Sequence, residues 1–168
     1  MDNDIKEACK IMQEGGLILY PTDTIWGIGC DATNELAVKR VYEIKKRIDS
    51  KALIVLVDSP AKIDFYTIVY PNARNLAHNL LAEDGSVGIR ITKEPFSHKL
   101  CERFRKAIVS TSANISGAPS PRNFSEISQE IKDAVDYIVE YRQNEMTHPS
   151  PSSVIKLEEG GIVKILRP

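Results

Sequence analysis

The sequence predicts an α/β fold: one domain with a twisted, mixed β-sheet and flanking helices. Helix-like segments alternate with short apolar, strand-like segments over most of the chain, and the C-terminal end is typical of an antiparallel hairpin. The chain has 168 residues, of which 42% are apolar, and this is enough for one continuous core. We therefore expect residues 1–168 to form a single domain.

Helical spacing of apolar residues predicts a series of helices. Their inward-facing residues are Ile5, Ala8, Cys9 and Met12; Ala37, Val41 and Ile44; Phe96, Leu100 and Phe104; and Ile127 and Ile131. Gly15–Gly16 supplies a stop for the first helix, whereas Thr33 or Asn34 caps the second, which runs to about Lys46. Ser125 is expected to cap the last helix.

Short apolar runs predict the strands between these helices. They comprise residues 17–20 (LILY), 52–57 (ALIVLV), 86–92 (SVGIRIT), 107–111 (AIVST) and 137–141 (YIVEY). The first run is interrupted at Pro21, and the second is the clearest core strand in the sequence. Pro60 and Pro71 each suit the start of a further helix, and the second of these helices would lead on to Leu81.

The C-terminal segment predicts a β-hairpin. Residues 153–157 (SVIKL) are followed by the four-residue loop EEGG and by residues 162–167 (IVKILR). If Leu157 opposes Ile162, then Ser152 opposes Arg167, and a hydroxyl lies beside a guanidinium. The polar segment before the hairpin, residues 143–151, is expected to be a surface loop rather than a domain boundary.

Composition and charge exclude several classes of protein. The net charge is −1, whereas a protein held to nucleic acid by bulk electrostatics is normally basic, so any RNA contact must be local. Cys9, Cys30 and Cys101 lie far apart without a C-x-x-C pair, which argues against a disulfide framework or a structural zinc site. The acidic N-terminus does not resemble a secretory signal, and no apolar run approaches the length of a membrane span. We therefore expect a cytoplasmic protein with no membrane partner.

Three polar segments near the ends of predicted strands carry the candidate chemistry. They are residues 20–32 (YPTDTIWGIGCDA), 45–47 (KKR) and 109–121 (VSTSANISGAPSP). Between Lys39 and Lys51 six cations stand against two acids, so positive charge is concentrated around the second segment. Loops at strand ends are where open α/β sheets bind ligands.

Each polar segment also has a purely structural interpretation. Thr-Asp-Thr can be a self-satisfied turn, the lysines can complement a helix macrodipole for about 0.3–1 kcal/mol, and Ser-Thr-Ser-Ala-Asn can be a polar turn. Together, however, cations and a hydroxyl-rich loop match the needs of a polyphosphate. The sequence contains no phosphate-binding loop motif, dinucleotide fingerprint or nucleophile elbow.

Six segments between Tyr20 and Pro168 occur in the order found in one enzyme family. They are PTDTIWGIGCDA, the K-x-R of residues 45–47, SVGIRI, STSAN, PSSVI and ILRP. On these segments the sequence resembles the YrdC/TsaC family, whose members are threonylcarbamoyl-AMP synthases. The resemblance implies conversion of L-threonine, bicarbonate and ATP into threonylcarbamoyl-adenylate and pyrophosphate. It also implies a twisted sheet around a concave, positively lined cavity.

The resemblance assigns roles residue by residue. Lys45 and Arg47 would hold the ATP phosphates and stabilise the leaving pyrophosphate. The remaining nucleotide contacts that it implies are Ser112, Asn114, Ser120 and Arg167. The threonine contacts that it implies are Thr22, Arg90, Ser110 and Ser152, with Arg90 on the carboxylate. Mg²⁺ is expected to be carried by the phosphates rather than by protein ligands.

The expected product implies a partner enzyme that consumes it. The sequence also leaves two alternative functions open. A downstream tRNA threonylcarbamoyl transferase would consume it, and direct contact with tRNA or double-stranded RNA is left open. One alternative is a non-catalytic RNA-binding protein. The other is a YciO-like paralogue with a different carbamoyl acceptor, because Ile48, Ala52 and Leu56 replace residues that are common in the family.

Overall fold

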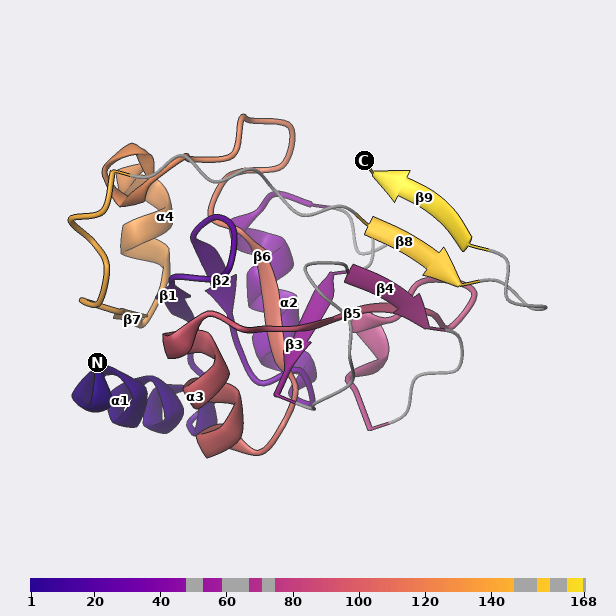
Figure 1. The fold of residues 1–168 in the computed structure, drawn as a ribbon, viewed down its shortest axis with the longest axis horizontal. Coiled ribbons are helices and arrows are strands. Elements are labelled where there is room, and N and C mark those ends of the chain that lie inside the picture. Colours follow the sequence, from indigo (N-terminus) through magenta and orange to yellow (C-terminus); the bar gives the residue numbers. More distant parts are fainter. Residues whose placement is uncertain (48–52, 59–66, 71–74, 147–153, 158–162, 168) are drawn as a thin grey trace.

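The strands of this protein form one mixed sheet. The computed structural model describes residues 1–47, 53–58, 67–70, 75–146, 154–157 and 163–167. Over these residues nine strands lie in the order β7-β1-β2-β6-β3-β5-β4-β8-β9 (Figure 1). Their bounds are β1 Ile18–Tyr20, β2 Gly27–Gly29, β3 Ile54–Val57, β4 Thr67–Tyr70, β5 Val87–Ile91, β6 Ile108–Ser112, β7 Tyr137–Ile138, β8 Val154–Leu157 and β9 Val163–Arg167. Parallel pairs (β1–β7, β3–β5, β4–β8) lie among antiparallel ones, and the predicted α/β class with a mixed sheet is confirmed.

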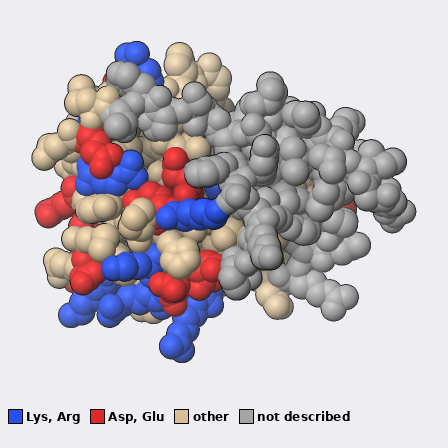
Figure 2. Space-filling view, in the orientation of Figure 1, with Lys and Arg blue, Asp and Glu red and all other residues tan. Residues whose placement is uncertain are grey.

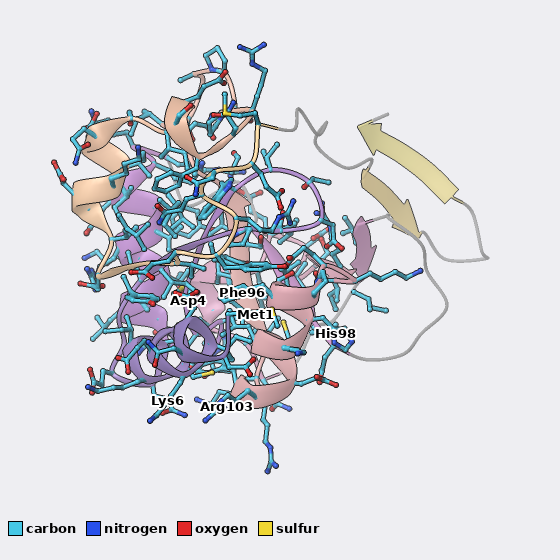
Figure 3. All side chains as sticks on the ribbon, turned by 60° about the vertical axis from the view of Figure 1, so that its left-hand side comes forward. Met1, Asp4, Lys6, Phe96, His98 and Arg103 are labelled. Carbon is cyan, nitrogen blue, oxygen red and sulfur yellow. The ribbon has the colours of Figure 1, made fainter. Side chains whose placement is uncertain are left out.

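Helices flank this sheet. In the described residues they are α1 (Asp2–Gln13), α2 (Glu35–Ile44), α3 (Pro95–Phe104) and α4 (Gln129–Ala134), with 3₁₀ turns η1 (His78–Leu80) and η2 (Phe124–Glu126). The apolar residues expected on the inner face of α1 are all buried, and Gly15 follows the helix with a positive φ of 83°. Figure 3 shows α1 beside α3, where Phe96 and Leu100 are buried. No helix of the described residues is both long and apolar enough to cross a membrane.

Strand β6 joins the two parts of the sheet. Its start pairs with β3, where Ile108, Val109 and Ser110 lie opposite β3 residues, and its end pairs with β2, where Ser112 lies opposite Gly27. Because one strand reaches both neighbours, the loop that follows β6 begins close to the start of β2 and to the chain that precedes it. This position matters for the polar residues described below.

Three sequence predictions are wrong in the described residues. The helix expected after Pro71 is reduced to the single turn η1, and residues 67–70 form strand β4, which periodicity did not identify. Ser125 does not cap α4: its hydroxyl donates to Asn123 Oδ1 at 2.7 Å, and the Ser128 side chain caps the helix instead. Strand β7 is shorter than predicted. The helix expected from Pro60 lies outside the described residues.

The C-terminal hairpin forms with a different register. β8 and β9 are antiparallel, as predicted, but Leu157 pairs with Val163, and an irregularity lies between Val154 and Ile155. Arg167 is consequently opposite Val154 rather than Ser152. The pairing of Leu157 with Val163 instead of Ile162, together with the irregularity, accounts for the shift. Ser152 itself lies outside the described residues.

Candidate functional site

Lys45 connects the end of α2 to the loop after β6. Its side chain is buried, with 2% of the residue exposed. The ammonium donates to the backbone oxygens of Ser112 and Asn114, each at 2.7 Å, and lies 3.4 Å from Asn114 Oδ1. The polar segments at residues 45–47 and 109–121 therefore meet, although they are more than sixty residues apart in the sequence.

The end of α2 explains why Lys45 points inward. Asn34 caps the start of the helix, and Lys45 ends it. Lys46 then adopts a left-handed conformation with φ of 49°, its N–H donates to Glu43 O, and the Arg47 N–H donates to Tyr42 O. This bond pattern is a Schellman motif, which turns the chain sharply. As a result the side chain of Lys46 lies outside, paired with Glu130 at 2.8 Å, while Lys45 enters the protein.

The loop after β6 is braced from several directions. Asn114 Nδ2 donates to Ala118 O at 2.6 Å, and the Ser116 N–H donates to Lys45 O at 2.9 Å. These bonds use the Asn114 side chain and the α2 terminus to fix the backbone between residues 112 and 118. Ser120, half-buried, follows in the same loop.

The electrostatics of this region favour an anion. Burial, and to a smaller extent the charge of Arg47, lower the pKa of Lys45 to about 8. The three acceptors around the Lys45 ammonium are a pair of carbonyls and an amide oxygen, none of which carries a formal charge. Burial also lowers the pKa of Arg47. An anion placed beside these two cations would stabilise their charged forms.

A second group of polar side chains lies together on one face of the sheet. Ser110 opposes Ile54 and Arg90 opposes Leu56, on the two strands that flank β3. Because Ile54 and Leu56 are two residues apart, Ser110 and Arg90 share a face of the sheet, and each is 5% exposed. Burial raises the pKa of the nearby Tyr20, and a hydrogen bond with Ser110 and the charge of Arg90 oppose that rise.

Gly27 links Thr22 to this group. A Cβ at Gly27 would lie 3.4 Å from Ser110 Oγ and 3.4 Å from Thr22 Cγ2, so both side chains border the same glycine. Thr22 is buried, and its hydroxyl donates to Ile25 O at 2.7 Å. Ser112, two residues beyond Ser110 on β6, connects this group with the Lys45 region.

The structure thus brings together most of the residues that the resemblance indicated. Lys45, Ser112 and Asn114 are in direct contact, and Thr22 and Ser110 border Gly27. Arg47 is half-buried beside α2, and Ser120 lies further along the loop. The backbone of Arg167 is placed at the end of β9.

Sequence reasoning missed the residues that support the segment around Thr22. Arg90 Nη1 donates to Thr24 Oγ1 at 3.2 Å, and Arg142 Nη1 lies 3.3 Å from Glu94 Oε1 and 3.5 Å from Thr22 O. Arg142 carried no signal, because it follows a strand far along the chain and belongs to no polar cluster. Thr24 could have been found, since it flanks Asp23 in the first polar segment.

The outer surface carries charges of both signs. Figure 2 shows Lys and Arg side chains interspersed with Asp and Glu on the face in view. Surface pairs such as Lys46–Glu130 and Arg122–Glu126 belong to this pattern. The cations of interest for binding are therefore the buried ones near the loop after β6.

The family is established by sequence comparison. The family model of Sua5, YciO and YrdC, described as "Telomere recombination", matches residues 10–67 and 64–168. The chain belongs to the Sua5/YciO/YrdC family. Threonylcarbamoyl-AMP synthase of Pseudoalteromonas translucida is 30% identical and covers 87% of this chain and 90% of its own length. A putative threonylcarbamoyl-AMP synthase of Methanocaldococcus jannaschii is 32% identical over 93% of this chain and 81% of its own.

Solved structures with this fold agree. P. abyssi Sua5 complexed with L-threonine is similar with a TM-score of 0.82 and 26% identity. The match covers 98% of this chain and 53% of that one, so this chain spans about half of the Sua5 protein. E. coli YciO matches with a TM-score of 0.83 at 22% identity, over 99% of this chain and 89% of that one, which supports the fold alone. The resemblance stated from sequence is confirmed.

Proposed function

We propose that this protein is a threonylcarbamoyl-AMP synthase. It joins L-threonine, bicarbonate and ATP into threonylcarbamoyl-adenylate with release of pyrophosphate. Curated relatives at about one-third identity carry this name over most of the chain. The observation that carries the proposal is the burial of Lys45 beneath Ser112 and Asn114, next to the group formed by Thr22, Arg90 and Ser110.

The nucleotide is proposed to bind at the end of α2 and the loop after β6. Lys45 and Arg47 place positive charge where the phosphates would lie, and Ser112, Asn114 and Ser120 line the loop. Lys45 keeps the loop backbone fixed while its charge remains uncompensated by the acceptors that it contacts. Arg167 completes the proposed nucleotide contacts from the C-terminal hairpin. ATP enters with Mg²⁺ on its phosphates.

L-Threonine is proposed to bind beside Gly27. Arg90 can form a two-pronged ion pair with the substrate carboxylate, and a guanidinium on a buried strand suits that role. Thr22 and Ser110 border the glycine, the first with its methyl group and the second with its hydroxyl. Ser152 is the fourth proposed threonine contact. Because Gly27 lacks a side chain, the substrate can approach the sheet closely at this point.

The chemistry needs positioning and charge neutralisation rather than a covalent nucleophile. The threonine amine captures bicarbonate or carbon dioxide to give a carbamate, and a carbamate oxygen attacks the α-phosphorus as pyrophosphate leaves. Both reactants are anions, so cations that hold them together lower the barrier, and positioning alone can supply about 7–11 kcal/mol in favourable cases. Lys45 and Arg47 stabilise the charge that develops on the pyrophosphate. A closed site also protects the labile carbamate from water.

Further parts of the proposal concern the setting of the reaction. We expect residues 1–168 to act as one domain in the cytoplasm, and a tRNA threonylcarbamoyl transferase to consume the adenylate. Direct contact with RNA would be confined to a local cationic surface, since the net charge is −1.

The decisive experiment is incubation of the purified protein with ATP, Mg²⁺, bicarbonate and L-threonine. We expect threonine-dependent release of pyrophosphate and an adenylate of the corresponding mass. Replacing threonine by serine and other amino acids tests the alternative of a different carbamoyl acceptor. Pyrophosphate release that does not depend on threonine would contradict the proposal.

A further inference from the structure

Asp23 anchors the proposed threonine loop to a distant part of the chain. Its Oδ1 accepts hydrogen bonds from the backbone N–H groups of Lys93 and Glu94, each at 2.8 Å. Its Oδ2 accepts one from the Thr92 hydroxyl, also at 2.8 Å. All three donors lie in the turn between β5 and α3, about seventy residues away in the sequence. A carboxylate with this many donors is a strong local clamp.

This clamp controls the two threonines that flank Asp23. Thr22 borders Gly27, and Thr24 Oγ1 accepts a hydrogen bond from Arg90 Nη1 at 3.2 Å. Arg90 lies on β5, only two residues before Thr92. The segment around Asp23 is therefore tied to β5 at two adjacent points, one through Asp23 and one through Thr24. Loss of the first tie would let Thr22 and Thr24 move relative to Arg90.

A second set of contacts holds the clamp itself in place. Thr92 Oγ1 lies 2.6 Å from Ser97 Oγ, and the Ser97 N–H donates to Glu94 Oε2 at 2.7 Å. Glu94 is buried, and its other carboxylate oxygen lies 3.3 Å from Arg142 Nη1, which in turn lies 3.5 Å from Thr22 O. The Thr22–Asp23 segment is thus supported on one side by the start of α3 and on the other by Arg142. The negative charge of Asp23 near the start of a helix is also favourable.

We propose that Asp23 is the positioning residue of the threonine subsite. It touches no substrate; it fixes the backbone of Thr22 and Thr24 at the spacing from Arg90 and Ser110 that the substrate requires. The inference rests on the proposed function and deepens it, because it separates the groups that contact threonine from the group that holds them.

The test compares Asp23 with a matched aspartate at the other end of β2. Asp31 also accepts three hydrogen bonds, from the Thr33 N–H and hydroxyl and from Lys106, and neither Thr33 nor Lys106 is a proposed substrate contact. Both Asp23→Ala and Asp31→Ala should lower the thermal midpoint. Only Asp23→Ala should raise the KM for threonine, by about tenfold or more, with the KM for ATP changed far less. Equal KM values for threonine in Asp23→Ala and the wild type would overturn the inference.

Two conservative variants keep the test decisive if Asp23→Ala does not fold. Asp23→Asn retains Oδ1 for the two backbone N–H groups, and its amide can donate to the Thr92 hydroxyl, which can donate onward to Ser97. Its KM for threonine should stay close to that of the wild type. Thr92→Val removes only the Oδ2 bond and should raise that KM by a smaller factor than Asp23→Ala. If Asp23→Asn raises the KM as much as Thr92→Val or more, a role through hydrogen-bond geometry is wrong.

Direct binding separates failure of this inference from failure of the proposed function. Calorimetric titration of L-threonine into the wild type and Asp23→Asn and Asp23→Ala variants gives dissociation constants without turnover. A wild type that binds threonine but releases no pyrophosphate disproves the synthase reaction, while the Asp23 comparison is still decided by the dissociation constants. If the wild type binds no threonine, with or without ATP, both the inference about Asp23 and the proposed function are disproved.

Discussion

The two halves of the candidate site are held by charges of opposite sign. In the phosphate half, formed by Lys45, Ser112 and Asn114, a buried ammonium donates to neutral backbone oxygens. In the threonine half, around Thr22 and Arg90, the carboxylate of Asp23 accepts from neutral N–H and O–H groups. Each clamp leaves a net charge in place, positive under the proposed phosphates and negative on the far side of Thr22. One buried cation can therefore both fix a loop and attract an anionic ligand, whereas the carboxylate of Asp23 can only fix its loop.

Removal of Lys45 should have the largest effect. Lys45→Met keeps the apolar stem but removes the ammonium donor to the backbone oxygens of Ser112 and Asn114. Ser112 O keeps its bond from the Asn114 N–H, so the cost of about 1–3 kcal/mol for a buried polar group that loses its partner falls mainly on Asn114 O. ATP affinity should fall by about 100-fold or more, because both the loop and the charge are lost. Arg47→Ala should weaken ATP binding in the same direction. Titration with ATP measures both.

Lys46 provides the matched control for Lys45. It is the adjacent residue and carries the same charge, but its pair with Glu130 lies on the surface and is worth about 0–1 kcal/mol. Lys46→Met should therefore leave ATP affinity and turnover unchanged. Equal losses in Lys45→Met and Lys46→Met would show that only the overall charge near residues 45–47 matters.

Removal of Arg90 should affect the threonine half selectively. Arg90→Ala takes away the proposed partner of the substrate carboxylate and the donor to Thr24 Oγ1. The KM for threonine should rise by about tenfold or more, and by a larger factor than the KM for ATP. Arg103→Ala, on the exposed face of α3, is the control for loss of one positive charge. A larger rise in the KM for ATP than for threonine would contradict the assignment of Arg90.

The pKa of Lys45 predicts a pH dependence of ligand affinity that distinguishes the phosphate half of the candidate site from the threonine half. Burial lowers this pKa from 10.5 to about 8, so between these values the unfolded chain holds a proton that the folded protein has lost. The unfavourable contribution of Lys45 to stability is therefore fully present below pH 8 and is relieved as the pH rises towards 10.5. Bound phosphate should raise the pKa, so ATP affinity should decline above pH 8, by up to about tenfold per pH unit.

Titrations with ATP at several pH values check this dependence. In Lys45→Met the decline above pH 8 should disappear, and threonine affinity in the wild type should change much less over the same range. A wild type whose ATP affinity is flat from about pH 7 to about pH 9, one unit on either side of the Lys45 pKa of about 8, would show that the ammonium does not contact the phosphates.

Substitution of Cys30 should have the smallest effect on activity. The thiol is fully buried, and burial raises its pKa, so it is a poor nucleophile. Cys30→Ser should lower stability by about 1–3 kcal/mol, because it buries a hydroxyl. Turnover of the folded variant should stay within about twofold of the wild type, as expected if no covalent intermediate forms. A folded Cys30→Ser protein without activity would reveal a covalent route.

Local patterns predicted those parts of the fold that depend on local interactions. Helical spacing placed Ala8 and Met12 inside α1. Of the two caps predicted for α2, Asn34 is the one observed, and its side chain accepts from backbone N–H groups two and three residues away, which is a local contact. The strand at residues 67–70 was missed because its partners are β5 and β8, which come later in the chain. The hairpin register was wrong for a related reason, since an irregularity at Val154 cannot be read from alternation alone.

In the candidate site, too, local patterns could be predicted from the sequence and long-range contacts could not. Lys45 and the loop after β6 could be predicted, because residue types suited to phosphate binding cluster in the sequence, and the resemblance joined the two clusters. The contacts that support the segment around Thr22 could not be predicted. Arg142 and Glu94 reach Thr22 only through the tertiary fold, and neither lies in a recognisable motif.

Because of the left-handed turn at Lys46, the side chains of Lys45 and Lys46 point in different directions and can be altered independently. Asparagine or glycine tolerates a φ of 49° at least as well as lysine, so either residue could replace Lys46 without opening the turn. The protein's isoelectric point and colloidal behaviour could then be altered next to a binding residue whose direction stays the same. The surface charge at Lys46 can thus be changed without changing Lys45, although the two residues are joined by a single peptide bond.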